Sequence, residues 1–129
     1  MEANLIHRLR DALEKAQEDG VAIAHFDVAD IVLLKAVFAS AREPKVPVLV
    51  GASEGEREFL GVRQLAALVR SLREEFDFPI FLIADHTHSL EKALEAARSG
   101  FDAVVFDLSA LPLNKMFSKP ELRSGRSKV

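Results

Sequence analysis

The sequence predicts an α/β protein in which four parallel β-strands alternate with helices. Short, continuous apolar runs recur along the chain, as expected of strands that are covered on both faces. Between these runs lie segments whose apolar residues repeat about every 3.6 positions, as in helices that bury one face. Strands that alternate with helices of this length are joined by right-handed crossovers, so we expect one parallel sheet with helices packed against it.

Each element is placed by its apolar pattern and its end signals. The strands are predicted from the runs VAIAHF, VPVLVGAS, PIFLIA and DAVVFD, and the segments SEGEREFLG and DHTHS are expected to be loops. Asp30 and Ser89 are predicted N-caps, while Gly20 and Gly100 are predicted C-terminal stops. The apolar positions of the four helices are Leu5, Ile6, Leu9, Ala12, Leu13 and Ala16; Ile31, Leu34, Val37, Phe38 and Ala41; Leu65, Leu68, Val69, Leu72 and Phe76; and Leu90, Ala93, Leu94 and Ala97.

Composition narrows the classes of function. The chain has 129 residues, is 49% hydrophobic and carries a formal charge of −3, which fits one globular core. Its 17 basic residues are scattered among 20 acidic ones, so the charge pattern of a nucleic-acid-binding protein is missing through most of the chain, and only the last stretch KPELRSGRSKV is locally basic. No apolar run approaches the length of a membrane span, and the amphipathic N-terminus is unlike a signal peptide, so we expect a cytoplasmic protein. Without cysteine, only His, Asp and Glu remain as metal ligands.

Two architectures fit this pattern, an open doubly wound sheet and part of a (β/α)8 barrel. A doubly wound nucleotide-binding protein carries a glycine-rich phosphate loop after its first strand, but this chain has HFDVAD there. The barrel is therefore favoured. Because a complete barrel takes about 250 residues, four units predict the first half of a (β/α)8 barrel.

Polar residues follow every predicted strand, at the edge where parallel α/β proteins place their sites. The sharpest signal is FLIADHTHS, in which Asp85 and His86 adjoin at the exit of an apolar strand. A neutral imidazole is a good zinc ligand, and a neighbouring carboxylate can move a proton. The alternative is that both side chains only bind loop backbone groups. The strand-end residues are His25 and Asp27, Ser53 and Glu54, Asp85, His86 and His88, and Asp107 and Ser109.

From residue 13 to residue 112 the chain resembles the N-terminal half of class II fructose-bisphosphate and tagatose-bisphosphate aldolases. The segments that carry the resemblance are AIAHFDV, PVLVGASEGEREFLG, FLIADHTHSLEKALEAARSGFDAVVFD and LSALP, in family order and spacing. The resemblance implies a reversible aldol cleavage of a ketose bisphosphate to dihydroxyacetone phosphate and an aldehyde, with zinc as the Lewis acid.

The resemblance also implies roles for five residues. Asp85 corresponds to the catalytic proton donor and acceptor, and His86 to one of three zinc ligands. Asp107 matches an acidic residue near the metal, which orients a ligand or holds a second cation. Ser53 matches a serine beside the substrate. Asp27 stands where the family usually has a substrate-contacting Asn, so the identity of the sugar phosphate stays open.

Two further zinc histidines and the phosphate-binding loops belong to the second half of the family barrel. We therefore expect the isolated chain to bind zinc weakly and to lack aldolase activity. Its exposed strands should favour self-association into a homo-oligomer. The alternatives are a non-catalytic half-barrel interaction module and another phosphate-handling barrel protein.

The domain boundary is predicted near Leu113, with residues 1–113 as the family-like part and residues 114–129 as a tail unlike the family. Suitable synonymous codons for residues 113–123, read in a shifted frame, would encode EQNVFKTRAA, which resembles the family continuation. We expect a one-base deletion near Leu113 or a disordered tail. An artefact and a divergent native end are the alternatives.

Overall fold

The computed structural model describes residues 8–116, and four parallel strands form its one sheet in the order β1-β2-β3-β4. The predictions made for Leu5, Ile6 and most of the tail lie outside this range. The elements in chain order are α1 (Leu9–Asp19), β1 (Ala24–Asp27), α2 (Ile31–Arg42), β2 (Val48–Ala52), α3 (Glu54–Leu60), α4 (Val62–Phe76), β3 (Ile80–Thr87), α5 (Leu90–Ser99), β4 (Ala103–Phe106) and α6 (Leu113–Met116).

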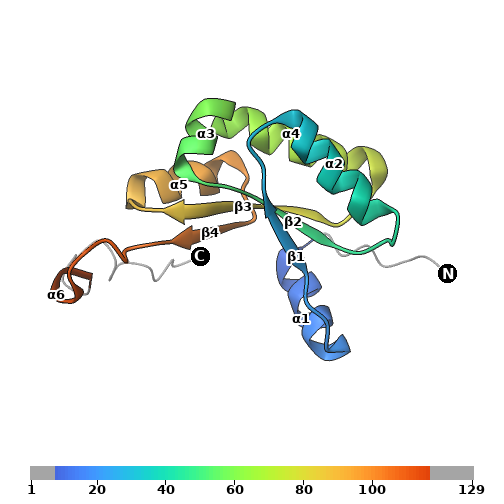
Figure 1. Cartoon of the computed structure of the whole chain (residues 1–129), viewed down its shortest axis with the longest axis horizontal. Helices are drawn as coiled ribbons and strands as arrows, with labels where there is room; N and C mark the ends of the chain where they lie inside the picture. The colour runs from blue at the N-terminus through green and yellow to red at the C-terminus, as the bar shows by residue number, and fades with distance from the viewer. Residues whose placement is uncertain (1–7, 117–129) are drawn as a thin grey trace.

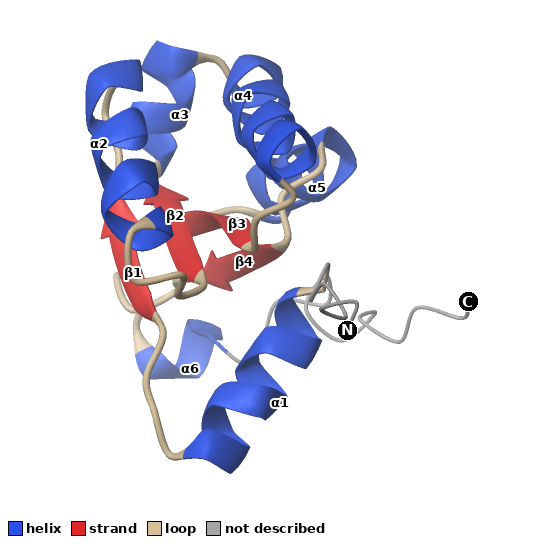
Figure 2. Ribbon diagram, turned by 90° about the vertical axis from the view of Figure 1, so that its right-hand side faces the viewer, coloured by secondary structure: helices blue, strands red, loops and turns tan. Residues whose placement is uncertain are grey.

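The topology is that of consecutive units of a (β/α)8 barrel. Figures 1 and 2 show α2, α3, α4 and α5 on one side of the sheet, and α1 and α6 on the other. A doubly wound sheet reverses its strand order and carries crossover helices on both faces, whereas here the order is sequential and the helices that follow β1, β2 and β3 share one face. That face is the outside of a barrel.

The core lies between the sheet and the helices α2, α4 and α5. Alternate residues of the two central strands point into it, since successive side chains of a strand point to opposite faces. Phe38 of α2 also packs against the rings of Phe76 and Phe78, with centroids 5.2 and 5.5 Å away. The core residues of the central strands and of the helices α2, α4 and α5 are Val48, Val50, Ala52, Ile80, Leu82 and Ala84, together with Leu34, Phe38, Ala41, Leu65, Ala66, Val69 and Ala96.

The predicted helix ends are confirmed. The Asp30 carboxylate accepts a hydrogen bond from the Leu33 amide at 2.7 Å, and Ser89 Oγ accepts one from the Lys92 amide at 3.2 Å. Gly20 and Gly100 both adopt the left-handed conformation that ends a helix. None of the described helices combines the length and apolar character needed to cross a membrane.

Four predictions about local structure were wrong, one of which concerns DHTHS at the end of β3. The segment SEGEREFLG contains the helix α3, which begins at the N-cap Ser53 with a capping box to Glu56. The run that contains β1 was expected to be covered on both faces, but all four β1 residues are exposed. The reason is that β1 pairs only with β2 among the described strands. Leu13 of α1, predicted to be buried, is 46% exposed. The buried residues of α1 are Ala12 and Ala16.

Candidate active site

The third strand bends at the residues that the sequence singles out. The segment DHTHS was expected to be a loop, but β3 continues through Asp85 and His86 to Thr87. Its register with β4 shifts between Ala84 and Thr87, and His86 has φ = 39°. In a regular strand, adjacent side chains point to opposite faces. With this irregularity, His86 Nε2 lies 3.7 Å from Asp85 Oδ2, so the two side chains share one region.

A buried arginine holds this bend from behind. Arg57 of α3 is 2% exposed, and its guanidinium donates to the carbonyl oxygens of Ala52 and Asp85 and, at 3.1 Å, to Thr87 Oγ1. Burial lowers the pKa of Arg57, while the nearby Glu54 and other carboxylates oppose that shift. Arg57 thus joins the ends of β2 and β3. Arg57 was not among the predicted site residues. Its burial follows from its place on the helix α3, and that segment was predicted to be a loop.

His86 and Asp107 form what is called here the His86 pair. His86 Nδ1 lies 3.1 Å from Asp107 Oδ2, and Asp107 Oδ1 accepts from the Ser109 amide at 2.9 Å. Hydrogen bonds from Ser109 and then from His86 hold the pKa of Asp107 well below its usual range. The hydrogen bond to Asp107 and then the charge of Asp85 raise the pKa of His86. The pair is therefore an imidazole whose orientation a fixed carboxylate sets.

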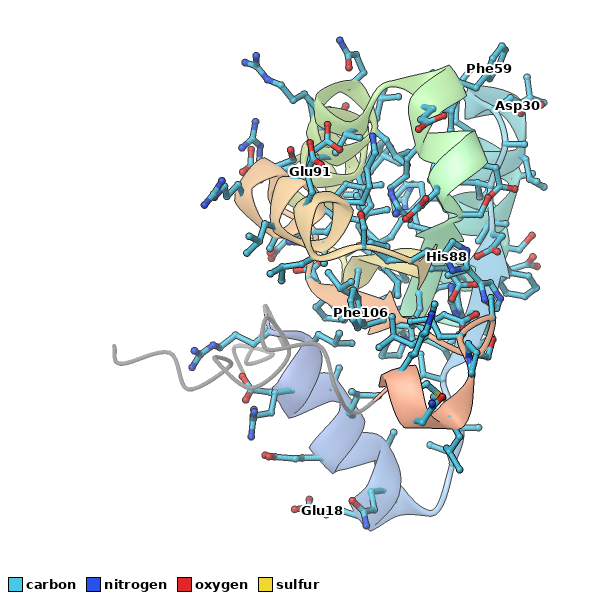
Figure 3. The ribbon with its side chains drawn as sticks, turned by 90° about the vertical axis from the view of Figure 1, so that its left-hand side faces the viewer. Glu18, Asp30, Phe59, His88, Glu91 and Phe106 are labelled. Carbon is cyan, nitrogen blue, oxygen red and sulfur yellow. The ribbon has the colours of Figure 1, made fainter. Side chains whose placement is uncertain are left out.

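His88 contacts the same edge without joining that pair. Its amide donates to Glu54 Oε1 of α3 at 2.8 Å, and its Nδ1 lies 3.2 Å from the Asp107 carbonyl oxygen. Figure 3 labels His88 and Phe106 close to the ends of the strands, between α3 and α6. His88 therefore links the end of β3 to α3 and to the residue after β4.

A second group of side chains lies on β1 and β3. One ligand atom each from His25, Asp27 and Asp85 lies within 4.8 Å of the others, and His25 Nε2 is 3.3 Å from Asp27 Oδ1. These three residues are called here the His25 group. Burial, followed by the charges of Asp85 and Glu56, raises the pKa of Asp27. The predicted site did not include His25, although an H-x-D spacing on a strand puts both side chains on one face.

A glycine makes room for the His25 group. Gly51 of β2 is the register partner of Asp27, and it lies in the strand between β1 and β3. A Cβ atom at this position would collide with Asp27 Oδ1 and His25 Nε2. The side chains of β1 can therefore lean over β2 toward Asp85 only because residue 51 has no side chain.

Ser53 lies at the same edge but is engaged in the capping box of α3. Glu56 Oε2 accepts from the Ser53 amide at 2.7 Å and from Ser53 Oγ at 2.9 Å. The Glu56 amide in turn donates to Ser53 Oγ at 3.4 Å. A hydroxyl oxygen has two acceptor positions, so one remains for a hydroxyl donor from a ligand.

The described residues fit a zinc site in part. A zinc-binding histidine typically gives one ring nitrogen to a carboxylate and the other to the metal, and the His86 pair has the first of these contacts. A catalytic zinc normally has three protein ligands. Within residues 8–116, His86 and the adjacent Asp85 and Asp107 supply one imidazole and two carboxylates.

The comparisons with known proteins define the class of protein. Residues 7–119 match the family described as class-II fructose-bisphosphate aldolase, and this range covers most of the chain. The chain therefore belongs to the class II fructose-bisphosphate aldolase family, as its motifs predicted. The match extends six residues past Leu113, the predicted boundary of the family-like part.

Individual relatives agree with this assignment. The chain is 31% identical over 110 residues to a probable fructose-bisphosphate aldolase of Bacillus subtilis (strain 168), over 83% of this chain and 39% of that protein. It is 33% identical over 99 residues to a fructose-bisphosphate aldolase of Thermus caldophilus, over 77% and 32%. The crystal structure of the YdjI aldolase from Escherichia coli K12 superposes with a TM-score of 0.73 at 25% identity, over 83% and 41%.

These coverages bear on the fold. The chain spans about 40% of the length of these relatives, or less. Four parallel strands alternating with helices, superposed on that share of an aldolase, form the first half of a (β/α)8 barrel. The predicted fold class is therefore confirmed.

Proposed function

We propose that this chain carries the first half of the active site of a class II ketose-bisphosphate aldolase. The substrate is fructose 1,6-bisphosphate or a related ketose bisphosphate, cleaved reversibly to dihydroxyacetone phosphate and an aldehyde, a reaction of glycolysis and related carbohydrate metabolism. The observation that carries the proposal is the geometry of β3 and β4, where His86 lies 3.7 Å from the Asp85 carboxylate and 3.1 Å from that of Asp107.

Asp85 is the proposed proton donor and acceptor. Its side chain is 17% exposed, which allows a substrate to reach the carboxylate while limiting access of water. Its carbonyl oxygen accepts from buried Arg57 at 2.9 Å, so the backbone from which the carboxylate extends is fixed. A carboxylate positioned in this way can take a proton as the carbon–carbon bond breaks and return it in the reverse direction.

His86 is the proposed zinc ligand, and Asp107 orients it or holds a second cation. When bound, zinc supplies Lewis-acid stabilisation of the negative charge that develops on the ketose oxygen. The Asp107 carboxylate fixes the His86 ring through Nδ1 and directs Nε2 toward Asp85. This arrangement places the proton-transferring group beside the ligand atom.

Ser53 and Asp27 are the proposed substrate contacts. The free acceptor position of Ser53 Oγ suits a sugar hydroxyl, because the Ser53 hydroxyl hydrogen is already donated to Glu56. The Asp27 carboxylate can also accept from hydroxyl groups, but its charge disfavours a nearby phosphate. Asp27 therefore favours a sugar whose hydroxyl groups, rather than a phosphate, approach β1.

A chimeric barrel tests the proposed function. Residues 1–112 would be joined to the second half of the Bacillus subtilis relative, and zinc content and fructose-bisphosphate cleavage measured beside the 129-residue chain. We expect turnover in the chimera alone, and tighter zinc binding in the chimera than in the 129-residue chain. In the chimera, Asp85→Asn should keep the zinc bound by His86 and lose about 10²- to 10⁴-fold in kcat, whereas His86→Gln should lose that zinc.

Asp77→Asn is the matched control, because Asp77 lies at the C-cap of α4 in a left-handed conformation that Asn also adopts. This substitution should leave the zinc content and the turnover of the chimera unchanged. Equal zinc content in the chimera and its His86→Gln variant would contradict the ligand assignment. Turnover by the 129-residue chain would contradict the need for a second half.

The exposed edges of the sheet support self-association. Phe26 of β1 is 48% exposed and Val105 of β4 is 43% exposed, and each strand pairs on one side only among the described strands. We expect a homo-oligomer of half barrels in the cytoplasm. Sedimentation of the 129-residue chain at several concentrations tests this, and a monomer throughout would contradict it. An interaction module without catalysis would self-associate equally well but would tolerate the Asp85 and His86 substitutions.

A further inference from the structure

We infer that His25, Asp27 and Asp85 bind a divalent transition-metal cation such as Zn²⁺, at a position distinct from the His86 pair. The inference does not depend on the proposed aldolase activity. It depends on where the sheet places three side chains, of which Asp85 is the proposed proton donor and acceptor and Asp27 a proposed substrate contact.

The first support is the distance between the ligand atoms. One nitrogen and two carboxylate oxygens lie within 4.8 Å of one another. Around a tetrahedral zinc ion with bonds of about 2.1 Å, ligand atoms are about 3.4 Å apart. His25 Nε2 and Asp27 Oδ1 lie 3.3 Å apart, which matches this spacing.

The second support is charge. Asp27 lies near the carboxylates of Asp85 and Glu56, so three carboxylates gather at this edge of the sheet. Within the described residues, His25 is the only basic side chain paired with Asp27. A divalent cation would neutralise the repulsion between Asp27 and Asp85. Asn, the usual family residue at position 27, has no charge and would not create this repulsion.

The third support is the space that the sheet leaves. Asp27, Gly51 and Ile83 are register partners across β1, β2 and β3, and Asp85 lies two residues beyond Ile83. Residues two apart on a strand share a face, so His25, Asp27 and Asp85 lie on the face opposite the helices α2, α4 and α5. Gly51 keeps the space between them free of a side chain.

The ligand types define the cation. One imidazole with two carboxylates suits Zn²⁺, Mn²⁺ or Fe²⁺, whereas Mg²⁺ and Ca²⁺ prefer ligand sets made of oxygen alone. Three protein ligands leave open positions for water or a substrate oxygen. A cation at this site would also occupy Asp85, so its binding and proton transfer by Asp85 would compete.

Zinc titration of the full 129-residue chain tests the inference. Metal-free chain would be titrated with Zn²⁺ by calorimetry, for the wild type and for His25→Gln, Asp27→Asn, His86→Gln and His88→Gln. We expect His25→Gln and Asp27→Asn to weaken Kd at least tenfold. His88→Gln is the matched control, because His88 lies at the same edge outside the His25 group, and it should leave Kd unchanged.

A second measurement keeps the test decisive if a variant unfolds. In the wild-type chain with ¹⁵N-labelled histidine, one equivalent of Zn²⁺ should shift the Nε2 resonance of His25 and leave that of His88 in place. Unchanged His25 resonances would overturn the inference. Weakened binding in His86→Gln, with His25→Gln and Asp27→Asn unaffected, would also overturn it and assign the cation to the His86 pair.

Discussion

The His25 group and the His86 pair lie at the same edge of the sheet but are held in different ways. Asp107 of the His86 pair accepts from the backbone of Ser109 as well as facing the imidazole, and its pKa is lowered. Asp27 of the His25 group faces other carboxylates, and its pKa is raised. One carboxylate is therefore stabilised as an anion by the protein itself, while the other is not. This difference indicates where an external cation is most needed.

The largest expected effect comes from a substitution that disturbs the His25 group and the His86 pair at once. Arg57→Met should lower the free energy of unfolding by about 3 kcal/mol, because it removes the donor to the buried Ala52 carbonyl oxygen and to the partly buried Asp85 carbonyl oxygen. Urea denaturation would measure the loss. Arg63→Met, at an exposed position of α4, should change stability by less than about 0.5 kcal/mol. Equal effects of the two substitutions would refute the anchoring role of Arg57.

The next largest effect should change the His25 group and leave the His86 pair unchanged. Gly51→Ala should weaken zinc binding by the His25 group at least tenfold, because the new methyl group displaces His25 and Asp27. It should cost about 1 to 2 kcal/mol of stability, and leave the His86 to Asp107 contact intact. Calorimetry and thermal unfolding would measure both. The control is Gly55→Ala in α3, where a Cβ meets nothing within 4 Å; it should leave zinc binding unchanged and stabilise the helix slightly.

The His86 pair can be examined through its titration. Because the pKa of His86 is raised in the folded protein, its ring should titrate above the ordinary value of about 6.5 by NMR. The stabilisation of the folded protein by protonated His86 is fully present below the ordinary pKa of histidine. It is lost as pH rises through the pKa of His86 in the folded protein. Asp107→Asn should lower the midpoint, and Glu91→Gln on α5 should not. A midpoint insensitive to Asp107→Asn would contradict the assigned cause.

The smallest expected effect concerns Asp27 alone. Its raised pKa means that folding disfavours the charged carboxylate, so the penalty is absent at low pH and appears as pH rises through the unfolded value. Asp27→Asn should therefore stabilise the metal-free chain at pH 7 by a few tenths of a kcal/mol, after allowance for solvent screening. The gain should vanish near pH 3. Thermal unfolding at both pH values would detect it, and a destabilised variant at pH 7 would contradict the prediction.

Much of this fold could be predicted from local patterns. The two central strands are continuous apolar runs because both faces are covered, and Asp30, Ser89 and Gly20 are caps whose effect is local. The capping box of α3 was also present as Ser53 and Glu56, but the polar character of that segment favoured a loop. The exposure of β1 could not be read from its apolar run, because exposure depends on which strands lie beside it.

The site was less predictable than the fold. The Asp85 and His86 motif was visible in the sequence. The proximity of their side chains, however, requires a register shift and a positive φ at His86, which no residue pattern in the segment predicts. His25 could have been found from its spacing to Asp27 on one strand. The part played by Gly51 could not, because it depends on the register between β1 and β2. The roles assigned to the five predicted site residues stay predictions.

The contacts of Arg57 have a consequence for local opening. One side chain from α3 binds the last residue of β2 and two residues near the end of β3. Detaching any of these three elements exposes the same buried charge, so they should open as a single unit. In native-state hydrogen exchange, amides of α3, β2 and β3 should then share one opening free energy, while those of β1 exchange earlier.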